Sequence, residues 1–165
     1  MTIVGSDFVP SGPLLPTTFD FYSLLETEAD YPWINIRASD ASVNGDFETT
    51  FTKAKGYLVA YSATYGTNAF DFSGTLNTGD IATPMLTYSG SAQKGANLIG
   101  NPYPSAFDWS SADKTQFDDN FAYIYNESKI GGAGYKGLND IIAPNQGFFV
   151  ILMMISRLLL IVSQL

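Results

Sequence analysis

Acidic side chains ahead of an aromatic run are the residues of this sequence best suited to holding a cation. Asp118, Asp119 and Asn120 are consecutive, and Asp108 and Asp113 lie shortly before them. Calcium takes roughly six to eight oxygen ligands, and carboxylates and amides supply them. The spacing matches no EF-hand loop, and the alternative interpretation is a solvated acidic turn. We therefore expect no cofactor, with calcium at Asp118, Asp119 and Asn120 as the alternative.

Aromatic side chains near turns are the second kind of residue that could contact a ligand. Tyr and Trp rings can stack on sugar rings, because each combines a broad apolar face with a polar tip. The chain has 12 Phe, 10 Tyr and 2 Trp, so most of these rings must belong to a core. The candidates for ligand contact are the rings nearest to the predicted turns: Trp33, Tyr65, Tyr103, Trp109 and Tyr135.

The chemistry of the common hydrolases has no support in this composition. The chain contains no His and no Cys, which excludes a Ser-His-Asp triad, a thiolate nucleophile and most zinc sites. Glycoside hydrolysis needs two carboxylates facing a cleft, and nothing in the spacing of the 16 acidic residues selects such a pair. We therefore expect that the protein is not an enzyme.

The charge balance bears on the partners. With 8 basic and 16 acidic residues the net charge is -8, so phosphate backbones would repel the protein and nucleic acid is not an expected partner. Residues 1–6 contain no basic segment followed by an apolar run, so we expect no secretory signal in the chain itself. A membrane span needs about 20 apolar residues, and Arg157 interrupts the one apolar segment. No membrane span is expected.

The pattern of elements predicts an all-β fold. Short runs rich in Phe, Tyr, Val, Ile and Thr alternate with turn signals such as Asn44-Gly45 and Asn139-Asp140. A β-sandwich of two antiparallel sheets is favoured, with a β-barrel as the alternative. A short helical turn is predicted near residues 110–117. Strands are predicted at residues 19–25, 33–37, 46–51, 56–63, 68–76, 83–89, 96–100, 120–126 and 147–152.

Four blocks of the sequence recur in the same order, which predicts an internal duplication. We therefore expect one β-rich domain, residues 1–150, built from two pseudo-repeats at about 1–92 and 93–150. The matching blocks are residues 2–11 with 97–105, 19–22 with 121–125, 33–36 with 135–138, and 55–59 with 146–150.

The segment after Val150 differs from the rest of the domain. From Phe148 to Val162 every residue except Ser156 and Arg157 is apolar, whereas the preceding chain is polar and rich in Gly. Met has a single codon, so a one-base shift across Met153-Met154-Ile155 would read two consecutive Asp, which suit a turn. We expect an anomalous tail at 151–165 that is translated out of frame.

One phrase of the sequence resembles a known kind of module. The segment NLIGNPYPSAFDW (97–109), with GYLV (56–59), FSGTLNTGD (72–80) and APNQGFFV (143–150), is similar to a β-rich module of bacterial surface proteins exported by the type IX secretion system. The resemblance covers most of the chain up to Val150 and implies a module inside a longer secreted protein. In that family the module is thought to serve adhesion or glycan contact, and no catalytic residues are attached to it.

The expected function follows from the resemblance and from the absence of catalytic signals. It is a non-catalytic structural or adhesive module of an extracellular or cell-surface multidomain bacterial protein, with a carbohydrate-binding module as the alternative. Glycans or surface proteins are the expected partners. In the NPYPS phrase, Pro102 and Pro104 should turn the chain sharply. The favoured role of Asp108 and Trp109 is then structural, with Trp109 packed beneath the loop and Asp108 accepting backbone N–H groups.

Overall fold

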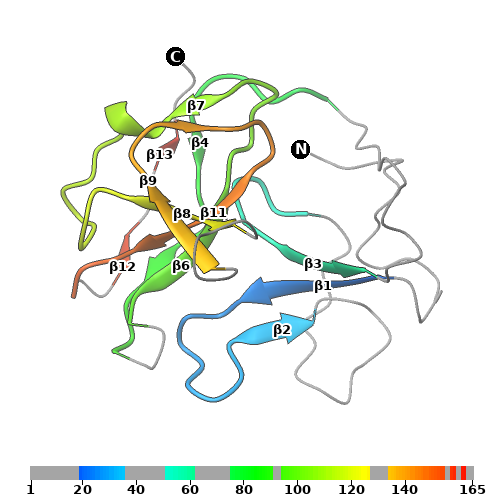
Figure 1. The fold of residues 1–165 in the computed structure, drawn as a ribbon, viewed down its shortest axis with the longest axis vertical. Helices are drawn as coiled ribbons and strands as arrows, with labels where there is room; N and C mark the ends of the chain where they lie inside the picture. Colours follow the sequence, from blue (N-terminus) through cyan, green and yellow to red (C-terminus); the bar gives the residue numbers. More distant parts are fainter. Residues whose placement is uncertain are drawn as a thin grey trace.

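A computed structural model describes residues 19–35, 51–61, 75–90, 94–126, 134–154, 157–158 and 161–162 (Figure 1). Within these ranges the regular elements are β-strands, apart from a single turn of 3-10 helix, η2 (Trp109–Ser111). The all-β prediction is confirmed. The same ranges contain no helix that is long and apolar enough to cross a membrane.

The described strands form five antiparallel sheets, of which two are larger than a pair. The largest has the order β6 (Ala96–Gly100), β11 (Gly147–Ile151), β8 (Ala122–Asn126) and β9 (Gly134–Leu138). The second has the order β2 (Trp33–Asn35), β1 (Phe19–Leu24) and β3 (Leu58–Tyr61). The remaining pairs are β10 (Ile141–Ile142) with β7 (Phe107–Asp108), β12 (Arg157–Leu158) with β5 (Leu86–Thr87), and β13 (Ile161–Val162) with β4 (Ile81–Ala82).

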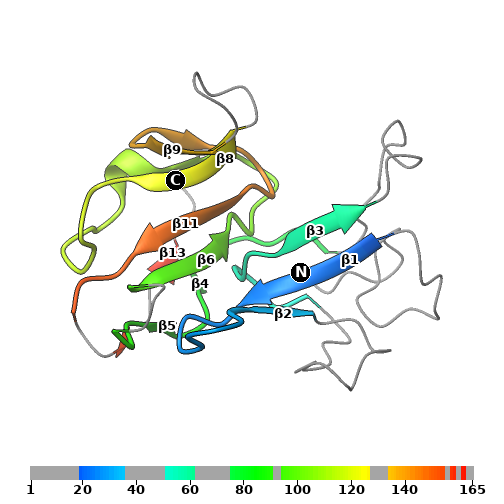
Figure 2. The same ribbon diagram turned by 60° about the horizontal axis from the view of Figure 1, so that its bottom comes forward.

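The two larger sheets meet at the outer edge of β6 (Figure 2). Lys55, just before β3, forms an isolated antiparallel bridge with Ile99, and the amide of Gly56 donates to the carbonyl of Leu98 at 3.2 Å. A Cβ at Gly56 would lie 2.6 Å from Leu98 Cγ, so only glycine permits this approach of the two chains. The junction between the two sheets therefore requires glycine at position 56 as well as these hydrogen bonds.

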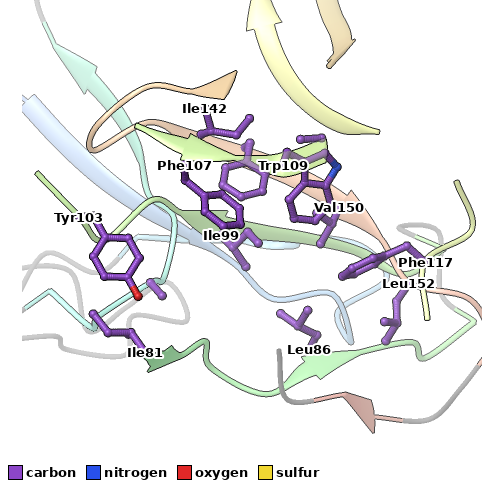
Figure 3. Close-up of a cluster of buried hydrophobic side chains, with 13 residues drawn as sticks. Ile81, Leu86, Ile99, Tyr103, Phe107, Trp109, Phe117, Ile142, Val150 and Leu152 are labelled. Carbon is purple, nitrogen blue, oxygen red and sulfur yellow. The ribbon is translucent and has the colours of Figure 1, made fainter. Parts of the chain in front are cut away.

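The core lies on one face of the four-stranded sheet (Figure 3). In β6 and β11 every second residue is buried, which is the period expected of strands with one covered face. Trp109 is 0% exposed and lies among aromatic rings, with centroid distances of 5.4 Å to Phe148 and 5.6 Å to Phe117. Its indole N–H donates to the carbonyl of Asn120 at 3.0 Å. The predicted packing of Trp109 is confirmed.

The NPYPS segment leaves β6 as a loop that side chains hold in place. Asn101 is buried, donates to the carbonyls of Ser105 at 2.9 Å and Ala143 at 3.0 Å, and accepts from the amide of Tyr103 at 3.0 Å. At the end of the loop, Asp108 accepts the amide of Ser110 at 2.9 Å, as predicted. The hydrogen bonds to Ser110 lower the pKa of Asp108 below its ordinary value. One buried amide and one exposed carboxylate thus fix both ends of the motif.

Three strands of the four-stranded sheet have the same order as the three strands of the smaller sheet. In the three-stranded sheet, β1 lies between β2 and β3. In the four-stranded sheet, β8 lies between β9 and β11. All four pairings are antiparallel. Three of the four recurring sequence blocks fall on corresponding strands of this arrangement. The first member of the remaining block, residues 2–11, lies outside the described residues. Two copies of one ancestral unit would produce this arrangement, and the duplication itself stays a prediction.

Several elements differ from the prediction in extent. The expected strand at 83–89 is limited to β5, with the unpredicted β4 just before it. The helical turn expected near residues 110–117 is the 3-10 turn η2, which begins one residue earlier and ends at Ser111. Strands β7, β9 and β10 were not predicted. Most of the expected strands at 46–51 and 68–76 falls outside the described residues.

Part of the expected tail belongs to the domain. Strand β11 continues through Ile151, and Leu152 is 1% exposed and part of the core. Leu152 also donates its amide to the carbonyl of Gly95 at 2.9 Å. Beyond it, β12 and β13 add to β5 and β4. Ile151 and Leu152 therefore pack with the preceding residues, whereas the domain boundary and the reading frame stay predictions.

Candidate ligand-binding groove

A cavity of about 530 Å³ opens on the face of the four-stranded sheet that is turned away from the core. Its size falls within the usual range for small-molecule sites, roughly 300–1,000 Å³. We call it the aromatic groove. The residues that line it are Leu24, Pro32, Trp33, Ala96, Tyr123, Tyr135, Phe149 and Ile151.

The register of the sheet places the floor of the groove. Phe149 of β11 lies opposite Tyr123 of β8, and Ile151 lies opposite Ala96 of β6. Side chains alternate between the faces of a strand, so these residues point away from buried Phe148 and Val150. Sequence alternation thus divides β11 into a core face and a groove face.

Aromatic rings from three strands meet over this floor. The centroid of Phe149 lies 5.1 Å from that of Tyr135 and 6.1 Å from that of Trp33, both in edge-to-face geometry. Tyr125, which pairs with Tyr135 across β8 and β9, lies 5.8 Å from it and is 57% exposed. Tyr135 itself is 47% exposed. The rings therefore present open aromatic surface rather than a closed core.

The buried carboxylate of Glu26 stabilises the β1–β2 hairpin, which carries Trp33. Glu26 lies in the connection between β1 and β2, and its carboxylate accepts hydrogen bonds from the amides of Ser89 at 2.9 Å and Gly95 at 3.1 Å and from the hydroxyl of Thr87 at 3.0 Å. Burial by itself raises the pKa of Glu26, but these hydrogen bonds outweigh it and the pKa lies below its ordinary value. The charged form therefore ties the β1–β2 hairpin to the loop before β6.

A polar pair lies beside the groove at Tyr123. The hydroxyl of Tyr123 donates to the Oδ2 atom of Asp119 in a short hydrogen bond, and Oδ1 of Asp119 accepts the amide of Phe121 at 2.9 Å. The hydrogen bond to the carboxylate raises the pKa of Tyr123 to about 12. Tyr123 is therefore neutral and fixed in orientation at physiological pH.

Two of the predicted ligand-contacting rings line the groove, and two do not. Trp33 and Tyr135 come together on either side of Phe149. Tyr103 and Trp109 are 1% and 0% exposed and belong to the core, so the expectation that these two rings face a ligand is wrong. Proximity to a turn did not distinguish a ring above the sheet from one beneath it. Tyr65 lies outside the described residues.

Two of the three predicted cation ligands, Asp119 and Asn120, are engaged with protein groups. Both oxygens of Asp119 already accept hydrogen bonds, and the carbonyl of Asn120 accepts the indole of Trp109. Within the part of the chain that the structure describes, no three Asp or Glu side chains gather as a metal site would require. The turn before strand β8 thus contains Asp118, Asp119 and Asn120. These contacts give no support to a calcium site there.

Phe149 is a groove residue that the sequence did not single out as a candidate. It lies in an apolar run between Phe148 and Val150, where nothing in the local composition distinguishes it from its neighbours. The strict alternation of the strand could have identified it, because Phe149 must face away from both neighbours. Its role depends on Trp33 and Tyr135 lying above the same face.

Comparison with known proteins gives a family and no named relative. A family model described as "Domain of unknown function (DUF8693)" matches residues 11–129, which is the greater part of the chain. That range contains Trp33 and Tyr123 and ends before Tyr135 and Phe149. Neither the curated proteins nor the solved structures gave a significant match.

Proposed function

Because the chain belongs to the family described as a domain of unknown function (DUF8693), whose description assigns no activity, we propose a role from its surface. The protein is a non-catalytic adhesive module of a secreted or cell-surface multidomain protein. It contacts its partner through the aromatic groove. The observation that carries the proposal is the open cluster of Trp33, Tyr135 and Phe149 above the four-stranded sheet.

The chemistry of the groove favours binding over catalysis. Its lining side chains are apolar or aromatic, and the tyrosine hydroxyls and the indole N–H of Trp33 are their polar groups. Large rigid rings provide contact area at a low cost in conformational entropy, which is why Tyr and Trp are enriched at binding surfaces. The carboxylate of Asp119, which contacts the groove residue Tyr123, is bound to the hydroxyl of Tyr123 and to a backbone amide. It is therefore poorly placed to transfer protons to a substrate.

Carbohydrate binding is the second candidate, and the placement of Trp33 and Tyr135 favours it. The two rings flank Phe149 in one cavity, so a pyranose ring entering the cavity can stack on aromatic faces. Tyr hydroxyls at the rim can hydrogen-bond sugar hydroxyls. Glycans and surface proteins thus remain the two partner classes that this surface suits.

Binding of the whole chain to immobilised polysaccharides and to immobilised extracellular matrix proteins tests both candidates. Trp33→Ala and Tyr135→Ala should each weaken saturable binding roughly tenfold or more, as loss of a central aromatic contact does. Tyr31→Ala is the matched control, because Tyr31 is 75% exposed and does not line the groove. Groove-dependent retention on polysaccharides would identify a carbohydrate-binding module, and retention on proteins alone an adhesive one. Binding unaffected by both groove variants would overturn the proposal.

A further inference from the structure

We propose that a second cavity, on the same face of the four-stranded sheet, binds the carboxylate of an acidic sugar. It has a volume of about 230 Å³ and lies between the segment leading into β3, the loop after β6 and the turn before β11. We call it the lysine pocket. The residues that carry the proposal are Phe51, Lys53, Lys55, Tyr57, Asn77 and Asn145.

The charge of the lysine pocket is opposite to that of the protein. Two of the 8 basic residues of the chain, Lys53 and Lys55, line it, and none of its lining residues is acidic. The molecule as a whole has a net charge of -8. A local concentration of positive charge on an acidic protein attracts an anion to one place. Lysine ammonium groups form strong hydrogen bonds with carboxylates.

Aromatic rings form the apolar part of the same pocket. Phe51 and Tyr57 pack edge to face with their centroids 4.8 Å apart, and the ammonium of Lys55 lies 5.4 Å from the centre of the Tyr57 ring. The hydroxyl of Tyr57 accepts the amide of Thr52 at 2.8 Å, which holds the ring against the turn. A ligand that combines a ring with a negative charge fits this combination better than a bare ion does.

The backbone around the pocket adopts conformations that ordinary residues rarely take. Ala54 and Asn145 both have φ near 56°, and they are two of the three non-glycine residues with positive φ in the described part of the chain. Gly100 and Gly147, which pair across β6 and β11, leave the floor without side chains. Asn77 stands at the wall, where its amide donates to the carbonyl of Pro102 at 2.7 Å. The pocket is thus assembled from three fixed segments.

The size of the pocket limits the ligand to about one ring. Sites for drug-sized molecules span roughly 300–1,000 Å³, so a cavity of about 230 Å³ accepts a single monosaccharide unit. A uronic acid supplies both the ring and the carboxylate. The lysine pocket lies at the Gly100–Gly147 end of β6 and β11, whereas the aromatic groove lies at the Ala96–Ile151 end. The two proposals therefore stand on separate residues.

Titration of the ¹⁵N-labelled whole chain with D-glucuronate, D-glucose and acetate tests this assignment by NMR. Glucuronate should shift the amide signals of residues 52–57 and 145–147, while glucose and acetate should bind at least roughly tenfold more weakly, because each lacks the ring or the charge. The affinity for glucuronate should fall as salt increases. Equal binding of glucose would overturn the role of the lysines. Equal binding of acetate would overturn the role of the rings, and no shift with any probe would overturn the site.

Variants connect the result to the lysines. Lys53→Gln and Lys55→Gln should each lower the affinity for glucuronate roughly tenfold. Lys53 is exposed, so its substitution is not expected to disturb folding, and the NMR spectrum reports whether either variant stays folded. Lys136→Gln is the control, because Lys136 is an exposed residue of β9 that does not line the lysine pocket, and it should leave the affinity unchanged. Trp33→Ala should also leave it unchanged, which separates a failure here from a failure of the aromatic groove.

Discussion

Glu26 and Ser89, 63 positions apart in the sequence, are joined by three kinds of hydrogen bond. The carboxylate of Glu26 accepts the amide of Ser89 at 2.9 Å and its hydroxyl at 3.0 Å, and the hydroxyl also reaches the backbone carbonyl of Glu26 at 3.2 Å. Glu26 is 3% exposed. A buried carboxylate is stable only when such donors replace water. This contact fixes the hairpin that carries Trp33 to the loop that leads into β6.

Glu26→Gln should lower the free energy of unfolding by about 1–3 kcal/mol at pH 7, because an amide cannot accept the same set of charge-assisted hydrogen bonds. Urea denaturation followed by circular dichroism measures the change. Glu28→Gln is the matched control, since Glu28 is exposed in the same turn, and it should change stability by less than about 0.5 kcal/mol. Equal effects of the two substitutions would contradict the assigned role of Glu26.

The same carboxylate predicts a dependence on acid. Its pKa in the folded protein is lowered from the ordinary 4.5, so its contribution is fully present above about pH 4.5. The contribution is lost as the pH falls through the lowered pKa, because the unfolded chain takes up the proton more readily. The wild-type protein should therefore lose stability relative to Glu26→Gln below pH 4.5. A constant difference between the two proteins from pH 7 down to pH 3 would rule this out.

Two glycines with similar backbone conformation should respond very differently to alanine. Gly79 has φ +71° with nothing within 4 Å of a built Cβ, so Gly79→Ala should cost only the left-handed penalty of roughly 1–2 kcal/mol. Gly95 has φ +81°, and its Cβ would lie 2.5 Å from the carbonyl oxygen of Leu152. Gly95→Ala should therefore cost clearly more than Gly79→Ala in urea denaturation. Similar costs would show that the contact with Leu152 can relax freely.

Tyr123 should be the tyrosine near the groove that resists deprotonation. The hydrogen bond to Asp119 raises its pKa from the ordinary 10.0 to about 12. The stability from this pair is present below about pH 10 and declines as the pH rises toward 12. Asp119→Asn should return the pKa toward 10, as measured by NMR titration of ¹³C-labelled tyrosine. An unchanged titration in Asp119→Asn would show that burial, rather than the carboxylate, sets the pKa.

Two apolar residues at the end of β11 separate core from surface. Leu152 is 1% exposed, so Leu152→Ala should cost about 2–5 kcal/mol through lost burial and a residual cavity. Met154 is 84% exposed, and Met154→Ala should change stability by less than about 0.5 kcal/mol. Thermal unfolding monitored by circular dichroism measures both. A neutral Leu152→Ala would mean that the domain core ends before residue 152.

The local sequence predicted those strands for which the alternation of side chains and the flanking turn residues indicate the same boundaries. β6 occupies the predicted residues 96–100, and β1 begins at the predicted Phe19. β9 was missed because Gly134 and Gly137 carry no strand preference, and it forms through five cross-strand pairs with β8. The short strands β7 and β10 likewise form because they pair with each other. Pairing between distant segments is the information that local propensity lacks.

The site was predictable by residue type but not by position. Trp33 and Tyr135 were predicted as ligand-contacting rings because they lie near turns. The same criterion selected Tyr103 and Trp109, which are buried in the core. The difference arises from the face of the sheet on which each ring lies. For Tyr103 it also arises from a hydrogen bond, at 2.5 Å, from its hydroxyl to the carbonyl of distant Gly79. Such contacts are fixed by the tertiary structure and leave no local signal.

The burial of the tryptophans gives the protein two built-in optical reporters. The chain has 2 Trp, and Trp109 is 0% exposed in the core while Trp33 is half-buried in the aromatic groove. Indole emission shifts to longer wavelength as the ring meets water. Trp33→Phe therefore leaves a fluorescence signal that reports global unfolding through Trp109. In the wild-type protein, quenching without a change in the Trp109 emission marks occupancy of the groove.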